Sequence, residues 1–203
     1  MSDAEIQRVL SFWFSASELD SLRVDSRMDR WFGNDEVFDR RISDEFGELI
    51  EQASLGELMD WTATAQGRLA LILLLDQFRR NVYRHSEKAF ARDKLALKIC
   101  IEGTMAGHYK PLSSYERMFF FMPLQHAESL RIQEKSVEIY SALAEKVSET
   151  LRETFLTTAQ FAELHRDIVA EFGRFPHRNG ILGRENTEAE NAYLTGDGAA
   201  FEQ

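Results

Sequence analysis

The stretch of sequence that decides the fold reads LALILLLDQF and runs from Leu69 to Phe78. Its first seven residues are all apolar, and the helical pattern extends back to Thr64. A helix that is apolar on most sides belongs in the interior of a protein. We therefore predict a central, buried helix over residues 64–78, around which the other elements pack.

Hydrophobic periodicity is helical along nearly the whole remaining chain, and no segment shows the alternation of a strand. Residues 15–33 are expected to be loop with a short helix. Further helices are expected after Ser2, after Asn34, over residues 87–105, 115–122, 124–147 and 149–172, and after Thr187. Nothing in the sequence resembles a linker. We predict one all-α domain over residues 1–195, built from antiparallel helix pairs, with a loose tail over residues 196–203.

Four local signals predict where helices begin and end. Asn34 is a good N-cap, and Thr187-x-x-Glu190 is a capping box. Gly173 stands where a glycine commonly ends a helix. Pro123 is expected to interrupt a helix, because proline lacks a backbone donor and clashes with the preceding turn.

The charge of the chain limits what it can bind. The formal net charge is -10 over 203 residues, and the pI is about 5.1. Residues 1–75 hold 15 Asp and Glu against 7 Arg, a net of -8. Nucleic-acid binding needs basic side chains that neutralise phosphates, and an acidic surface repels anionic membranes. We therefore expect neither nucleic acid nor a membrane as a partner.

Three features favour the cytoplasm. The longest apolar run, Leu69 to Leu75, is far shorter than the roughly 20 residues of a membrane-spanning helix. The N-terminal residues lack the basic start of a signal peptide. The single cysteine, Cys100, permits no disulfide within the chain, and its apolar helical surroundings predict a buried structural thiol.

Asp76 directly follows the apolar run and lies near a predicted helix C-terminus, where the helix dipole disfavours negative charge. It therefore needs a cationic partner, and Arg80 at i+4 and Arg79 at i+3 are within reach. The pattern predicts either an ion pair that ends the helix or a carboxylate that orients a guanidinium toward a bound anion.

Residues 172–184 form a second informative stretch, with three arginines, one histidine and no acid. Guanidinium groups bind the oxygens of carboxylates and phosphates through paired hydrogen bonds. The stretch therefore predicts an anion site. The alternative is a solvated basic loop that pairs with the acidic front half of the chain.

A third stretch contains His126 and Glu128, whose spacing of two places them on different faces of a regular helix. His165 and Asp167 repeat that spacing. The four side chains are chemically suited to a metal, but the chain has neither a His-Glu-x-x-His motif nor a cysteine pair. We therefore expect no metal site, and the sequence identifies no cofactor.

Several phrases, taken in order, resemble the family called domain of unknown function 924. They are Val9-Leu10-x-Phe12-Trp13-Phe14, Leu75-Asp76-Gln77-Phe78-x-Arg80-Asn81, Ala89-Phe90-Ala91-x-Asp93, Arg117-x-Phe119 with Met122-Pro123-Leu124-x-His126-x-Glu128, and Gly173-Arg174-Phe175-Pro176-His177-Arg178-Asn179 with Leu182-Gly183-Arg184. The resemblance spans essentially the whole chain. It implies a tetratricopeptide-like helical fold, and it implies no reaction.

The chain departs from the family pattern at two positions. Arg79 stands where a proline is usual, so the turn at Asp76 is expected to be less rigid. Ala127 stands where a serine is usual between His126 and Glu128, which excludes a serine nucleophile at that point.

Selected polar residues of these phrases, together with His165, form the candidate ligand-binding site. They are Asp76, Arg80, Asn81, Arg117, His126, Glu128, His165, Arg174, His177, Arg178, Asn179 and Arg184. Among them, His126, Glu128 and His177 are the candidates for acid–base catalysis.

Three hypotheses follow from this set. The favoured one is a pocket for a small phosphate or carboxylate, with or without hydrolase or transferase activity; the sequence does not decide whether the protein is an enzyme. The second is a module that binds a peptide or an acidic tail on a helical surface. The third is a buried polar network that specifies the fold.

Overall fold

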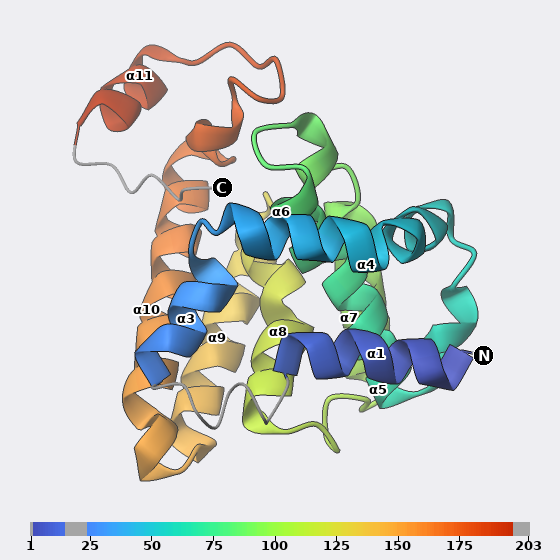
Figure 1. Ribbon diagram of the computed structural model, residues 1–203. Helices are drawn as coiled ribbons and strands as arrows, with labels where there is room; N and C mark the ends of the chain where they lie inside the picture. Colours follow the sequence, from blue (N-terminus) through green and yellow to red (C-terminus); the bar gives the residue numbers. More distant parts are fainter. Residues whose placement is uncertain (1, 15–23, 197–203) are drawn as a thin grey trace. The chain divides into compact units, whose positions relative to one another are not determined.

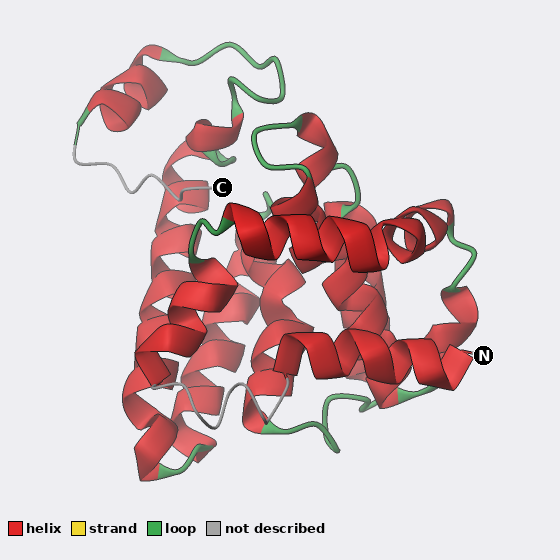
Figure 2. Ribbon diagram, viewed as in Figure 1, coloured by secondary structure: helices red, strands yellow, loops and turns green. Residues whose placement is uncertain are grey.

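The computed structural model describes residues 2–14 and 24–196, all of which form helices, turns or loops without a strand (Figures 1 and 2). The predicted all-α class is therefore confirmed. The predicted loop over residues 15–23 and the predicted tail beyond residue 196 lie outside the described residues. The chain divides into two compact units, and the prediction of a single domain stays a prediction.

Unit 1 comprises residues 1–84 and 88–123. Its elements are α1 (Ser2–Phe14), α3 (Val24–Phe32), α4 (Glu36–Leu55), the 3-10 helix η1 (Met59–Ala63), α5 (Ala65–Ile72), the π-helix η2 (Leu73–Phe78), α6 (Arg79–Val82), most of the short 3-10 helix η3 (Glu87–Ala89), α7 (Asp93–Met105) and α8 (Ser114–Gln125) up to Pro123.

The central helix of unit 1 is the predicted one. Thr64 caps its N-terminus by accepting a hydrogen bond from the Gly67 amide, and every residue from Leu69 to Phe78 is buried. The helix differs from the prediction in two ways. It widens into a π-helix over Leu73–Phe78 and continues through α6 to Val82.

Arg68 is a buried arginine of this central helix, on α5, and its hydrogen bonds go to backbone carbonyls and a histidine. The Arg68 guanidinium donates to the carbonyls of Thr62 and Ile99 and to Nδ1 of His108, at 2.8 to 3.2 Å. A Cβ at Gly103 would lie 2.2 Å from Arg68 Cδ, so the glycine is what leaves room for the guanidinium.

Cys100 lies on α7 and is buried, as predicted. Burial raises the pKa of its thiol to about 12, because the thiolate would lose its hydration. The thiol is therefore protonated and shielded in the folded protein.

Several predicted boundaries are wrong. Asp35, and not Asn34, caps α4, because its carboxylate accepts from the amides of Val37 and Phe38. Pro123 lies inside α8, which continues for two more residues to Gln125, so the proline does not end the helix as predicted. Helix α7 begins at Asp93 and not at residue 87.

Unit 2 comprises residues 85–87 and 124–203. Its elements are α9 (Leu130–Lys146), α10 (Glu149–Phe172), the 3-10 helix η4 (Pro176–Arg178) and α11 (Glu188–Thr195). Helices α9 and α10 form an antiparallel hairpin (Figure 1). The predicted capping box of Thr187 and Glu190 is confirmed, and Gly173 ends α10 at φ 70°, also as predicted.

Beyond the hairpin, the chain turns back onto α10 at an apolar cluster. Phe175 is buried against Ile168 and Val169, with Tyr193 of α11 at its edge. Phe175 thereby fixes the polar loop on either side of it. None of the described helices is long and apolar enough to cross a membrane.

Candidate functional site

In unit 1, Asp76 and Arg80 form the predicted ion pair, and a second carboxylate, that of Asp93, joins them. The Arg80 guanidinium lies 3.4 Å from the Asp76 carboxylate and makes two hydrogen bonds of 3.0 Å to Asp93. Burial by itself lowers the pKa of Arg80, but attraction to Asp93 and Asp76 outweighs it and the pKa is raised. Sequence reasoning did not include Asp93, because no helical spacing connects it to Arg80.

The other two unit 1 candidates also contact protein groups. Asn81 donates to the Asp39 carboxylate at 2.7 Å. Arg117 donates to the carbonyls of Tyr109 and Lys110 and so holds the turn before α8. These contacts assign both residues a role in the fold of unit 1, and a role in ligand binding stays a prediction.

In unit 2, Glu128 fastens the loop that follows α10. Its carboxylate accepts two hydrogen bonds from Arg184, at 2.8 and 2.9 Å, and one from the Phe175 amide at 2.9 Å. Arg184 also donates to the Phe175 carbonyl. Burial raises the pKa of Glu128, but these donors outweigh it, so the pKa lies below its usual value.

Two more candidates of the same loop hold its C-terminal part. Arg174 makes paired hydrogen bonds of 2.6 and 2.8 Å to Glu190 of α11. Asn179 is fully buried and donates to Asn186 at 2.8 Å. The hydrogen bond from Arg174 lowers the pKa of Glu190 to about 2. Glu190 was identified from its capping box, and nothing in the spacing pointed to its pairing with Arg174.

Three of the remaining candidates of unit 2 surround the Phe175 ring, and the fourth, His126, lies beside His165. The Arg178 guanidinium stacks over it at 4.5 Å from the ring centre. The rings of His165 and His177 lie 5.5 and 5.6 Å from it, centre to centre, and His126 lies 6.5 Å from His165. We call these four residues, His126, His165, His177 and Arg178, the histidine cluster.

The pKa of His165 shows the electrostatic environment of the histidine cluster. Burial lowers the pKa of His165 to about 3, and the positive charges of His126, Arg178 and His177 add to the effect. A hydrogen bond between Nδ1 and the Phe161 carbonyl opposes it only in part. The imidazole is therefore neutral at physiological pH, in a place where neighbouring groups disfavour further positive charge.

A residue outside the predicted set fixes the backbone beside His126. Gln133 of α9 is fully buried, and its amide donates to the carbonyls of Gln125 and Ala127 at 2.7 and 2.8 Å. Arg178 donates to the carbonyl between them, that of His126, at 3.2 Å. The segment that carries His126 is thus held from α9 and from the loop after α10.

The described residues contain no group of three or more His, Cys, Asp or Glu side chains placed to hold a metal ion. The set of His126, Glu128, His165 and Asp167, which has the right chemistry, is therefore not arranged as a metal site.

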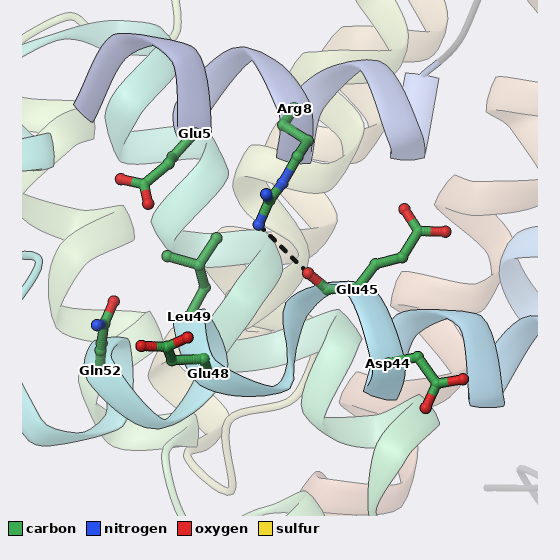
Figure 3. Close-up of a pocket in the computed structure, with 7 residues that line it drawn as sticks. All are labelled: Glu5, Arg8, Asp44, Glu45, Glu48, Leu49 and Gln52. Carbon is green, nitrogen blue, oxygen red and sulfur yellow. Dashed lines mark hydrogen bonds between the residues drawn. The ribbon is translucent and has the colours of Figure 1, made fainter. Parts of the chain in front are cut away.

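One pocket of about 300 Å³ lies on unit 1, and none of the predicted site residues lines it. Glu5 and Arg8 of α1 face α4 across it, and Arg8 donates to the Glu45 carbonyl oxygen (Figure 3). Asp44 and Glu48 add two more carboxylates to its wall. An acidic lining disfavours an anion, so this pocket is not the predicted anion site.

Comparison with known proteins places the chain among proteins of unknown function. The family model described as bacterial protein of unknown function (DUF924) matches residues 9–198. The solved structure of a protein of unknown function from Agrobacterium tumefaciens is similar, with 36% sequence identity and a TM-score of 0.79, over 96% of this chain and 99% of that one. Among curated proteins there is no match.

Proposed function

The chain belongs to the DUF924 family of bacterial proteins of unknown function, and on that premise we propose that its unit 2 binds a small anion, a phosphate or a carboxylate, at the histidine cluster. The observation that carries the proposal is the convergence of two imidazoles and one guanidinium on the ring of Phe175, with the third imidazole, His126, beside His165. These residues come from three separate parts of the sequence.

The charge of the histidine cluster supports an anionic ligand. Arg178 lowers the pKa of His165, which means that it adds positive potential at that ring, and His126 and His177 act in the same direction in their protonated forms. An anion bound there is attracted by the same potential. Guanidinium groups recognise the oxygens of carboxylate or phosphate through paired hydrogen bonds.

The cluster also provides groups for acid–base chemistry. We propose His126 and His177 as proton donors or acceptors in a hydrolase or transferase reaction on the bound anion, because imidazole changes its protonation near neutral pH. Glu128 has a positioning role here, since its three hydrogen bonds go to Arg184 and to the Phe175 amide.

Of the other predicted residues, some hold the loop of the histidine cluster in place, and the rest lie in unit 1. Arg174, Asn179 and Arg184 fasten the loop that carries His177 and Arg178. In unit 1, Asp76, Arg80, Asn81 and Arg117 stay predicted ligand-binding residues.

The proposal is tested by a thermal-shift screen of inorganic phosphate, phosphate esters, carboxylates, nucleotides and divalent metals, followed by calorimetry. A ligand at 100 times its Kd stabilises the folded state by about 2.7 kcal/mol, so binding raises the melting temperature. The test variant is Arg178→Gln. The matched control is Arg152→Gln, which removes an exposed guanidinium from α10 of the same unit.

We expect an anion to stabilise the wild type and the Arg152→Gln variant and to lose its effect on Arg178→Gln. A folded Arg178→Gln variant that responds like the wild type contradicts the proposal. If Arg178→Gln unfolds and no anion stabilises the wild type, the cluster is a structural network and has no ligand.

A second candidate function is peptide binding by a tetratricopeptide-like stack of helices. It is favoured by the α9–α10 hairpin, since antiparallel helix pairs are the repeating element of such stacks. Arg178 would then hold an acidic tail or a C-terminal carboxylate. Tight binding of an acidic peptide with a free C-terminus but not of its amidated form, together with no effect of any small anion, favours this function over the first.

A further inference from the structure

A hydrogen bond between two basic side chains, Arg68 and His108, joins the central helix of unit 1 to the turn between α7 and α8. Arg68 is buried, and its Nε lies 3.2 Å from Nδ1 of His108. A guanidinium nitrogen can only donate, so Nδ1 must accept with its lone pair. The hydrogen of the imidazole is then on Nε2, and the ring is neutral. The contact therefore exists only while His108 is unprotonated.

The other hydrogen bonds of Arg68 go to groups that do not titrate. Its two terminal nitrogens donate to the carbonyls of Ile99 in α7 and Thr62 in η1, at 2.8 and 2.9 Å. Arginine stays charged in proteins. The guanidinium thus joins η1, α5 and α7 at any pH, whereas its bond to the turn depends on one proton at His108.

The turn over residues 106–113 has a second anchor, and this one is on α8. Arg117 donates to the carbonyls of Tyr109 and Lys110. These bonds do not involve an imidazole, so a proton on His108 leaves them in place. Loss of the contact with Arg68 therefore frees the turn from α5 and leaves it attached to α8.

The surroundings of His108 disfavour its second proton. Burial lowers the pKa of His108, and the positive charge of Arg68 lowers it further. The other titratable side chains in the adjoining parts of these elements are Asp60 of η1, Cys100 and Glu102 of α7, Tyr109 and Lys110 of the turn, and Tyr115, Glu116 and Arg117 of α8. Histidine is the only one of these side-chain types that ordinarily changes charge near neutral pH.

We propose that the turn over residues 106–113 is a pH-sensitive latch, which the neutral His108 fastens to Arg68 and which protonation of His108 releases from α5. Protonation places an N–H group and a positive charge against the N–H group and positive charge of Arg68, so the imidazole moves away. The latch belongs to unit 1 and does not depend on an anion at the histidine cluster.

The size of the effect follows from proton uptake. The ordinary pKa of His108 is 6.5, and the fastened ring has a lower one. Because release takes up one proton, the released population rises by up to about tenfold per pH unit between these two values as the pH falls.

The experiment is hydrogen exchange of residues 106–113, measured by mass spectrometry at about pH 7.5 and about pH 5.5, on either side of the ordinary pKa of histidine. Protection is expressed relative to an unstructured peptide at the same pH. The proteins are the wild type, His108→Asn, His108→Leu and the control His85→Asn. An asparagine amide accepts without titrating, whereas leucine cannot accept. His85 is exposed at φ 59°, a conformation that asparagine tolerates.

We expect protection of the turn in the wild type and in His85→Asn to fall severalfold, up to about tenfold, at the lower pH. His108→Asn is expected to keep its protection at both pH values, and His108→Leu to be weakly protected at both. A wild-type turn that is equally protected at both pH values overturns the proposal. An equal pH effect in the wild type and His108→Asn also overturns it.

A second measurement uses only the wild type and covers the case in which the variants do not fold. Nitrogen-15 NMR distinguishes the two neutral tautomers of an imidazole. We expect His108 to be the Nε2–H tautomer at neutral pH, and the amide signals of the turn to change with the same apparent pKa as the ring. An Nδ1–H tautomer, or turn signals that do not follow the ring, overturns the latch.

Discussion

Glu128 is the residue on which the loop beside the histidine cluster depends most directly. One carboxylate accepts from both terminal nitrogens of Arg184 and from the Phe175 amide. A second carboxylate, that of Glu190, holds the neighbouring Arg174 through two hydrogen bonds, but of the two carboxylates only that of Glu128 binds the Phe175 backbone itself. Its position therefore depends on the negative charge of Glu128.

We expect Glu128→Gln to lower the free energy of unfolding by about 1 kcal/mol, because a charge-assisted pair is lost at a partly exposed position. The measurement is urea unfolding followed by circular dichroism. The control is Glu138→Gln on α9, whose exposed pair with Lys135 contributes little. Equal losses for the two variants would contradict the anchoring role.

His165 also predicts how stability depends on pH. Its folded pKa is about 3 and its ordinary value is 6.5. Between these values the unfolded chain binds a proton that the folded chain does not, so the free energy of unfolding decreases as pH falls below 6.5. His108 in unit 1 has a lowered pKa as well, from burial and from Arg68, and contributes with the same sign.

We expect the wild type to be less stable at about pH 5 than at about pH 7, and His165→Phe to lose less stability over that interval because it removes one of the two groups. Urea unfolding at both pH values measures the difference. An equal pH dependence in the wild type and the variant is the contrary result.

At the scale of elements, the first turn of α4 distinguishes two neighbouring cap candidates. Asp35 has the extended backbone of an N-cap and accepts from two amides, whereas Asn34 precedes it. We expect Asp35→Ala to cost about 1 kcal/mol and Asn34→Ala to stay within about 0.5 kcal/mol of the wild type. Thermal unfolding of the two variants measures this; the reverse order would show that Asn34 is the cap.

Two helical glycines predict opposite effects of the same substitution. A Cβ at Gly103 of α7 meets Arg68 Cδ at 2.2 Å and Phe120 Cζ at 2.8 Å, while a Cβ at Gly47 of α4 meets nothing within 4 Å. We expect Gly103→Ala to destabilise by about 1 to 3 kcal/mol through overpacking. Gly47→Ala is expected to stabilise by up to about 1 kcal/mol through helix propensity. Chemical denaturation measures both, and a destabilising Gly47→Ala or a neutral Gly103→Ala contradicts the packing described.

The sequence predicted helices better than it predicted their ends. The apolar run from Leu69 identified the central helix, because a helix that is buried on all sides has an unbroken series of apolar residues. The π-helical widening over Leu73–Phe78 left no such pattern in the sequence. Pro123 is a similar case: α8 contains it and ends two residues later, at Gln125, so the proline marked the end of the helix only to within one turn.

At the scale of the whole molecule, contacts within one helical turn were predictable and contacts across loops were not. Asp76 and Arg80 are four residues apart, so their pairing follows from helical geometry. Arg174 and Glu190 are separated by a loop, and Arg80 and Asp93 by 13 residues with a turn between them. Only the folded chain brings such partners together, which is why the candidate site was predicted as a set of residues and not as a geometry.

The predicted site residues divide between the two units. Eight of the twelve lie in unit 2, and Asp76, Arg80, Asn81 and Arg117 lie in unit 1. The experiments on Arg178 and His165 therefore test unit 2 by itself.

The buried thiol on α7 gives the protein a reporter of its own opening. Cys100 is the only cysteine in the sequence, and in the folded state it is both shielded and protonated, with a pKa of about 12. A thiol-specific dye can react only with molecules in which α7 has transiently separated from its neighbours, since the thiolate is the reactive form. The rate of dye incorporation in native buffer thus follows the population of opened molecules, without an introduced label and without denaturant.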